Sequence, residues 1–404
     1  MNFLKTKKIR ILVFFIVLSY LVLILSLMIS TGFLKIIYIA PPDKVFTNYS
    51  DEAIWNQINE RLYSGDANSW ALARYLINKG DVAGYQWMCE IYNFMVEPYG
   101  NPVVAKIIGE EGFKKIGQNT KIVDLIYLYQ NLAEAYFVLG IYFNGMDKKA
   151  YKLAKSAIDL NSLSTFEIKA RSAEDSLRIL NAIDLLNGKY DEVYNRSLQH
   201  INSNGLHFNG WLGVFFSSLY AHKKDKLAEV IDAAQKVLQI LKTKAATPDS
   251  EQEDYRNYYD LFSSICNVFN VFYYIETKNF DKAKEAYEML KKDDIKFDPE
   301  NGIYSQYYTF YAAAYYCYAT GDITSAIDYM IKLFSIPTLT FPETYYEPGI
   351  LKLAKELKID IKKIRDFDKD IESWKNKFWP VDRKKYKPLF DKELKNLLKY
   401  KRTW

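Results

Sequence analysis

The sequence is poor in the residues that form tight turns and metal sites. Its 404 residues include only 17 glycines, 11 prolines, three cysteines and three histidines. Few turn-forming residues favour long helices over many short strands. The cysteines are too few for a disulfide framework. His200 and His207 have no acid or cysteine at ligand spacing, so we expect no zinc site. The three histidines are His200, His207 and His222.

Signatures of catalysis are missing as well. The sequence contains no G-x-S-x-G nucleophile motif, no phosphate-binding loop and no dinucleotide fingerprint. The acidic run Asp366, Asp368 and Asp370 resembles the start of a calcium loop. Ile371 stands where that loop needs glycine, and Lys377 stands where it needs a bidentate glutamate. We therefore expect no catalytic residues, no cofactor and no bound metal, and predict that the protein is not an enzyme.

Positive charge is concentrated at the two ends of the chain. The formal net charge is +5, and residues 1–10 carry four cations without an acid. Residues 381–404 carry nine cations and three acids, which leaves a net charge of −5 for the rest. A nucleic-acid-binding domain would spread basic residues over its folded surface. We expect no nucleic-acid partner.

One long apolar run lies near the start of the chain. Residues 11–30, "ILVFFIVLSYLVLILSLMIS", are uncharged and as a helix would span roughly 30 Å, the thickness of a bilayer core. The cations before the run predict a cytoplasmic N-terminus and an extracytoplasmic remainder, periplasmic in a double-membrane bacterium. A cleaved signal peptide is the alternative. The predicted segments are a basic N-terminus at 1–10, a single-pass anchor at 11–34 and a linker at 35–50.

Four short turn sequences recur further along the chain. They are "GMDKKA" from Gly145, "GKYDEV" from Gly188, "KNFDKA" from Lys278 and "GDITSA" from Gly321. Each places a small apolar residue five positions after its start: Ala150, Val193, Ala283 and Ala326. The starting residues suit the left-handed end of one helix, and Asp191, Asp281 and Thr324 could cap the next. One such hairpin cannot bury its apolar stripe alone, so we expect stacked helical hairpins.

This pattern resembles the tetratricopeptide repeat family. The matching features are the aromatic–acid pairs Tyr190-Asp191 and Phe280-Asp281, the small residue that follows, and "SAIDLNS" at 156–162. The resemblance implies an all-α fold, a right-handed α-solenoid of antiparallel hairpins. The turns lie 43, 90 and 43 residues apart, whereas the family repeats every 34 or so residues. A further hairpin around "AHKKDKLAEV" fits the longest gap, and 71–92 fits an earlier unit.

The predicted regions after the linker follow from this pattern. They are a divergent helical region at 51–120, repeats at 121–336, and a C-terminal helical cap with a basic aromatic tail at 337–404. The tail has three interpretations: a solvated capping helix, a contact with anionic lipid headgroups, or a docking surface for an acidic partner.

The resemblance also implies a binding groove, because first helices line the concave side in this family. The corresponding positions are Tyr308, Tyr311, Tyr315, Tyr318, Val268, Phe272, Asp175, Arg178, Leu139 and Tyr142. The tyrosines form one helical stripe, and tyrosine is enriched in protein interfaces. Packing against a neighbouring helix is the alternative for the stripe. Asp175 and Arg178 could equally be an ordinary surface pair.

The expected function is that of a non-catalytic, membrane-anchored scaffold or adaptor. Its groove would hold a peptide or helix of another protein in a membrane-associated assembly. One alternative is an extracytoplasmic carrier or sensor that binds a small molecule, glycan or lipid in an aromatic groove. Another is an enzyme on a helical toroid, which would need clustered acids that the sequence does not show.

Overall fold

A computed structural model describes residues 67–94, 100–163, 174–203, 208–246, 252–292, 306–336, 338, 342–378 and 381–403. The predicted anchor, its flanking segments and residues 51–66 lie outside the described residues. The chain divides into two compact units, Met1–Tyr75 and Leu76–Trp404. Helix α4 (Ala67–Lys79) crosses that boundary. The contacts described below all lie within the second unit.

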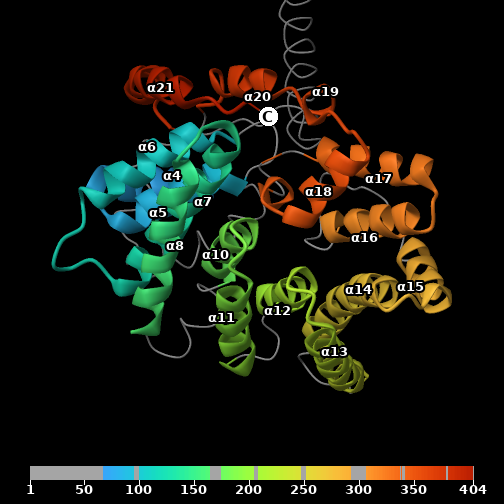
Figure 1. Ribbon diagram of the computed structural model, residues 1–404. Helices are drawn as coiled ribbons and strands as arrows, with labels where there is room; N and C mark the ends of the chain where they lie inside the picture. Colours follow the sequence, from blue (N-terminus) through green and yellow to red (C-terminus); the bar gives the residue numbers. More distant parts are fainter. Residues whose placement is uncertain are drawn as a thin grey trace, which may run out of the picture. The chain divides into compact units, whose positions relative to one another are not determined.

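The second unit is all-α, and its helices pack in sequential antiparallel pairs (Figure 1). This confirms the all-α part of the predicted fold and its antiparallel helix pairs. The pairs are formed by α5 (Val82–Phe94), α6 (Pro102–Phe113), α7 (Ile122–Tyr142), α8 (Met146–Ser162), α10 (Glu174–Leu186), α11 (Tyr190–Ser203), α12 (Phe208–Tyr220), α13 (Lys224–Ala245), α14 (Gln252–Glu276), α15 (Phe280–Lys292), α16 (Gln306–Ala319) and α17 (Ile323–Ser335). Within the described part of the chain, none of the helices combines the length and the apolar character that crossing a bilayer requires.

The predicted turn starters all mark bends between paired helices. Gly145, Gly188, Lys278 and Gly321 adopt left-handed backbone conformations, with φ of 80°, 73°, 60° and 86°. His222, with φ of 54°, forms the additional hairpin expected around "AHKKDKLAEV". The small residues Ala150, Val193, Ala283 and Ala326 are fully buried. These small side chains therefore belong to the buried core.

Gly145 differs from the others in its hydrogen bonding. At Gly188 the N–H donates to Leu185 O at 3.1 Å and the next N–H to Asp184 O at 2.9 Å, which is the Schellman pattern. Before Gly145, the N–H of Asn144 instead donates to Tyr400 O at 2.8 Å. The bend between α7 and α8 therefore depends on the C-terminal end of the chain.

The predicted helix caps were wrong by two residues. Asp322, rather than Thr324, accepts the Ser325 N–H at 3.1 Å, and Asn279 accepts the Lys282 N–H at 3.3 Å. Asp281 lies inside the first turn of α15. Asp191 forms an ion pair with Lys223. At Gly188, Lys278 and Gly321 a single residue separates the left-handed residue from the next helix, so these helices begin earlier than the aligned acids suggested.

Aromatic contacts join the first helices of successive hairpins. The Phe215 and Phe269 rings stack with centroids 3.9 Å apart and connect α12 to α14. Phe272 lies 4.8 Å from Tyr311 and connects α14 to α16. The core between hairpins is thus built from large rings, which bury more area per residue than aliphatic side chains.

The C-terminal region consists of mostly short helices within the described residues. Its elements are η1 (Pro342–Tyr345), α18 (Pro348–Glu356), α19 (Ile361–Ile364), α20 (Phe367–Trp374), α21 (Arg383–Leu397) and η2 (Leu398–Tyr400). It does not end as a cap on α17 but reaches α6 and α7, with α21 beside α6. The Asn101 amide donates to the carbonyls of Trp374 and Lys377, both at 2.9 Å. Phe143 and Lys401 form an isolated antiparallel bridge.

Replacing Gly321 with alanine tests the left-handed turns. A Cβ at φ of 86° is strained, so Gly321→Ala should lower the free energy of unfolding by about 1 kcal/mol. Gly117→Ala is the control, because Gly117 lacks a positive φ and a Cβ there meets open space. Urea unfolding of the detergent-solubilised chain measures both. Equal effects of the two substitutions would contradict the turn assignment.

Candidate functional site

The first helix of several hairpins contacts a segment that follows the last hairpin, α16 and α17. We call Pro342–Glu356 the inserted segment; it comprises η1, a turn and α18. On α7, the Tyr346 ring stacks on Phe137 with centroids 4.2 Å apart, and its hydroxyl donates to Phe137 O at 2.8 Å. A Cβ on Gly140 would collide with that hydroxyl. Glycine at this position therefore makes room for the tyrosine.

A buried arginine connects the inserted segment to two first helices. Arg178 of α10 forms ion pairs with Glu134 of α7 and with Glu343 of the inserted segment. All three side chains are at least nine-tenths buried. Burial raises the pKa of Glu134, and the nearby Arg178 opposes that rise. Loss of one partner of a buried ion pair typically costs about 3–5 kcal/mol, because the remaining charge is left uncompensated.

A second carboxyl of the inserted segment lies in a less polar setting. Glu347 is 3% exposed, and one of its oxygens has no hydrogen-bond partner. Burial raises its pKa to about 7, while hydrogen bonds from the Tyr220 hydroxyl and the Gly349 N–H act in the opposite direction. An unsatisfied buried polar atom costs about 1–3 kcal/mol. The inserted segment therefore buries one carboxylate oxygen of Glu347 without a hydrogen bond.

The tyrosine stripe of α16 faces the inserted segment. A Cβ on Gly349 would collide with the hydroxyl of Tyr311 and would lie 2.6 Å from that of Tyr220. Further along, Tyr318 forms a hydrogen bond with Glu356 at the end of α18. The segment thus follows α16 along the stripe. A cavity of about 20 Å³ beside it is lined by residues that include Arg178, Tyr308, Glu343 and Glu347.

The predicted groove residues are only partly gathered around this segment. Arg178, Tyr308, Tyr311 and Tyr318 lie near it, whereas Val268 and Phe272 belong to the core between hairpins. The buried members are Tyr308, Tyr311, Val268, Phe272, Arg178, Leu139 and Tyr142. The half-buried members are Asp175, Tyr315 and Tyr318. Their assignment to a partner-binding groove stays a prediction.

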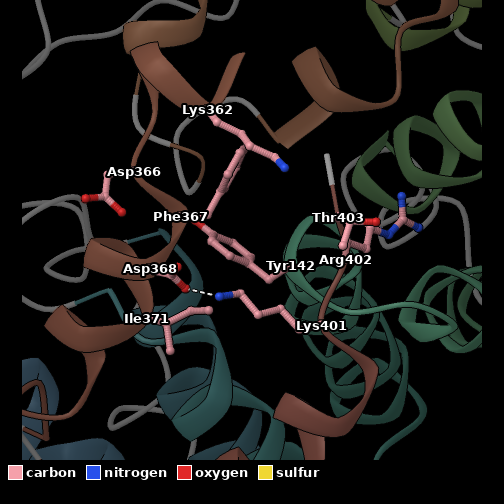
Figure 2. Close-up of a pocket in the computed structure, with 9 residues that line it drawn as sticks. All are labelled: Tyr142, Lys362, Asp366, Phe367, Asp368, Ile371, Lys401, Arg402 and Thr403. Atoms are coloured by element: carbon pink, nitrogen blue, oxygen red, sulfur yellow. Dashed lines mark hydrogen bonds and ion pairs between the residues drawn. The ribbon is translucent and has the colours of Figure 1, made fainter. Parts of the chain in front are cut away.

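Tyr142 lies at a separate cavity of about 410 Å³ near the C-terminal end of the chain (Figure 2). The ring of Phe367 packs edge-on against Tyr142, with centroids 5.6 Å apart. Lys401 is paired with Asp368, and Arg402 approaches Asp147 at 3.6 Å. The lining residues are Tyr142, Lys362, Asp366, Phe367, Asp368, Ile371, Lys401, Arg402 and Thr403. They combine aromatic surface with charged side chains.

The acidic run near this cavity has structural partners. Asp366 accepts the Lys369 N–H at 2.9 Å and caps α20, and Asp370 binds Arg365 through two hydrogen bonds of 2.7 Å. These interactions occupy the carboxylates that a cation would need. Across the residues that the structure describes, no three histidine, cysteine or acidic side chains gather as metal ligands.

Sequence reasoning missed Glu343, Tyr346 and Glu347. These residues lie in "PETYYEPG", a polar and aromatic stretch that follows the last repeat. Polar aromatic residues and paired glutamates between prolines are a signal for a segment that docks in an irregular conformation. The pattern alone does not show onto which helices it docks.

The comparisons with known proteins give no family. No protein-family model matches the chain, and no curated protein matches it.

The raised pKa of Glu347 predicts a pH dependence of stability. Its native pKa of about 7 lies above the ordinary value near 4.3, so the folded state holds the proton more tightly. The free energy of unfolding should therefore fall by up to about 3 kcal/mol as pH rises from about 4.5 to about 7. Glu347→Gln should remove this part of the fall, measured by urea unfolding between pH 5 and pH 8 in steps of about 0.5.

Asp124→Asn serves as the matched control. Burial and the nearby Asp81 raise the pKa of Asp124, in the first turn of α7, to about 6. This substitution should remove a fall centred at lower pH and leave the one near pH 7. An unchanged profile for Glu347→Gln would show that Glu347 is not buried in solution.

Proposed function

We propose that this protein is a non-catalytic, membrane-anchored scaffold whose first-helix side binds a segment of another protein. The described helices support a repeat of antiparallel hairpins, and we infer that they form a right-handed solenoid like that of tetratricopeptide repeats. The anchor at 11–34 and the extracytoplasmic position of the remainder are part of this proposal. They rest on the uncharged run and the cations that precede it.

The observation that carries the proposal is the inserted segment itself. Helices α7, α10, α12 and α16 already contact a short polypeptide stretch through ring stacking, an ion pair and hydroxyl groups. Stacked helical repeats present extended concave binding surfaces, so a segment of another protein could be held on the same side. Anchoring would then raise the effective concentration of a partner in the same membrane.

A carrier or sensor of small molecules is the second candidate. The cavity beside Tyr142 has a volume of about 410 Å³, which lies in the range of ligand pockets. However, the Lys401 and Asp368 side chains in its wall are paired with each other. The charges that would recognise a small ligand are therefore partly neutralised, and we favour the scaffold.

The C-terminal tail supports an additional contact with anionic lipids. Exposed cations on α21 and η2 accompany three exposed apolar residues, Leu389, Leu398 and Tyr400. The exposed cations are Arg383, Lys384, Lys385, Lys392, Lys395 and Lys399. Basic residues beside apolar ones are typical of helices that lie at a membrane surface.

Photo-crosslinking tests the scaffold function. A photoreactive phenylalanine analogue at Tyr315 or Tyr318, both half-buried on α16, should crosslink one defined partner in native membranes, because these side chains border the predicted groove. The control position is Ile331, which is exposed on α17, a second helix. Mass spectrometry identifies the products. The same products from all three positions, or none from any, would count against a groove-bound partner.

A charge-reversal variant tests the lipid contact. The full chain in nanodiscs carries a dye at Thr403→Cys, and energy transfer to a headgroup dye should be higher with anionic than with zwitterionic lipid. Lys384→Glu, Lys392→Glu and Lys395→Glu together should abolish the difference, because the attraction is about 1 kcal/mol per cation. The matched control reverses the exposed Lys148, Lys152 and Lys155 of α8. Equal loss in both variants would rule out a specific contact by α21.

A further inference from the structure

The inserted segment has the properties of a bound peptide rather than of an ordinary repeat helix. Its first four residues, Pro342–Tyr345, form a 3-10 turn, and a non-helical stretch separates this turn from α18. Helix α18 buries the apolar residues Ile350, Leu353 and Ala354, and the stretch before it makes polar contacts. Glu343 pairs with Arg178, Tyr346 donates to a backbone carbonyl of α7, and Glu347 accepts from Tyr220.

Two of these contacts determine which chemical groups a ligand must carry. Arg178 presents a buried guanidinium, and a carboxylate is the group that satisfies it best. The tyrosine site consists of the Phe137 ring, the Phe137 carbonyl and the space left by Gly140. It accepts a flat ring with a hydroxyl at its far end. Glu343 and Tyr346 lie three positions apart, so one short stretch reaches both.

The seated segment leaves polar atoms unsatisfied. Besides the Glu347 oxygen, the buried hydroxyl of Thr344 has no hydrogen-bond partner. Each such atom makes the packing of the inserted segment against the hairpins less favourable in free energy. A peptide that keeps the glutamate and the tyrosine, but leaves no unpaired polar atom at the positions of Thr344 and Glu347, would bind more tightly than the inserted segment.

We propose that the surface formed by Arg178, Phe137, Gly140 and Tyr220 recognises an acidic, tyrosine-containing peptide of a partner protein, and that the inserted segment is the resident occupant which this peptide displaces. This rests on the proposed scaffold function and names the class of its partner. Arg178 receives the carboxylate, and the ring of Phe137 receives the tyrosine. The partner stretch carries glutamate and tyrosine three positions apart.

The test uses the full-length chain in detergent and a labelled synthetic peptide, PETYYEPGILKLAKE, as the probe. Gly349→Ala should unseat the resident segment, because a Cβ there collides with the Tyr311 hydroxyl. Gly117→Ala is the control, since a Cβ there meets nothing. Fluorescence anisotropy should show binding to Gly349→Ala at least about tenfold tighter than to the wild type or the control, because only that seat is vacant.

A second peptide tests the role of Arg178. The same probe with glutamine in place of the residue equivalent to Glu343 should bind Gly349→Ala about tenfold more weakly or worse, because it lacks the charge that pairs with the guanidinium. Adding Arg178→Gln should remove the difference between the two peptides. Equal binding of both peptides to Gly349→Ala would overturn the proposal.

Hydrogen exchange on the wild-type chain keeps the test decisive if Gly349→Ala does not fold. Excess isotope-labelled probe should raise amide exchange at residues 343–350, and the glutamine peptide should not. Unchanged exchange with both peptides, together with no anisotropy signal, would overturn the proposal. Failure here with a successful crosslink from Tyr315 or Tyr318 would leave the scaffold function standing. If the peptide binds but no partner is crosslinked, the peptide-binding surface is supported and the scaffold function is not.

Discussion

The structure depends on one buried guanidinium. Arg178 lies on α10 and joins Glu134 of α7 to Glu343 of the inserted segment. The two glutamates and the arginine can be buried only together, because each charge would otherwise lie unpaired in an interior that solvates it poorly. This requirement ties two hairpins and a segment from far along the chain to one arrangement.

Tyrosine makes this arrangement possible. A tyrosine ring fills volume like phenylalanine, and its hydroxyl satisfies polar groups that would otherwise be stranded. Tyr346 does both at once, with its ring on Phe137 and its hydroxyl on the Phe137 carbonyl. Tyr315 donates to Glu276 at 2.7 Å, which connects α16 to α14. The abundance of tyrosine thus follows from a core that contains carboxylates and carbonyls as well as apolar groups.

The inserted segment changes how the first-helix side is understood. In an open stack of hairpins this side is a groove ready for a ligand, and the tyrosine stripe of α16 would line it. Here Glu347, Gly349 and Glu356 lie along the stripe. The two interpretations of the stripe, groove lining and internal packing, are therefore not exclusive. We propose that a surface that packs the chain's own peptide also receives a peptide of another chain.

The sequence by itself determined the hairpins. Gly145, Gly188, Lys278 and Gly321 take left-handed conformations, and the small residues five positions later are buried. Both features are local, so spacing along the chain is enough to reveal them. The groove positions on α16 were what the resemblance to tetratricopeptide repeats implied, and they stay a prediction. The exact caps could not be located from the sequence, because each depends on one local hydrogen bond that the aligned turns do not fix.

Only the tertiary structure decided what covers the first helices. Nothing in the spacing of Glu343 or Tyr346 indicates that they meet Arg178 and Phe137, which lie more than a hundred residues earlier in the chain. Nor does the sequence show that the C-terminal region reaches α6 and α7 through Asn101 and Phe143. Such contacts are chosen by the fit of shape and charge between distant surfaces. That fit exists only once the hairpins have stacked.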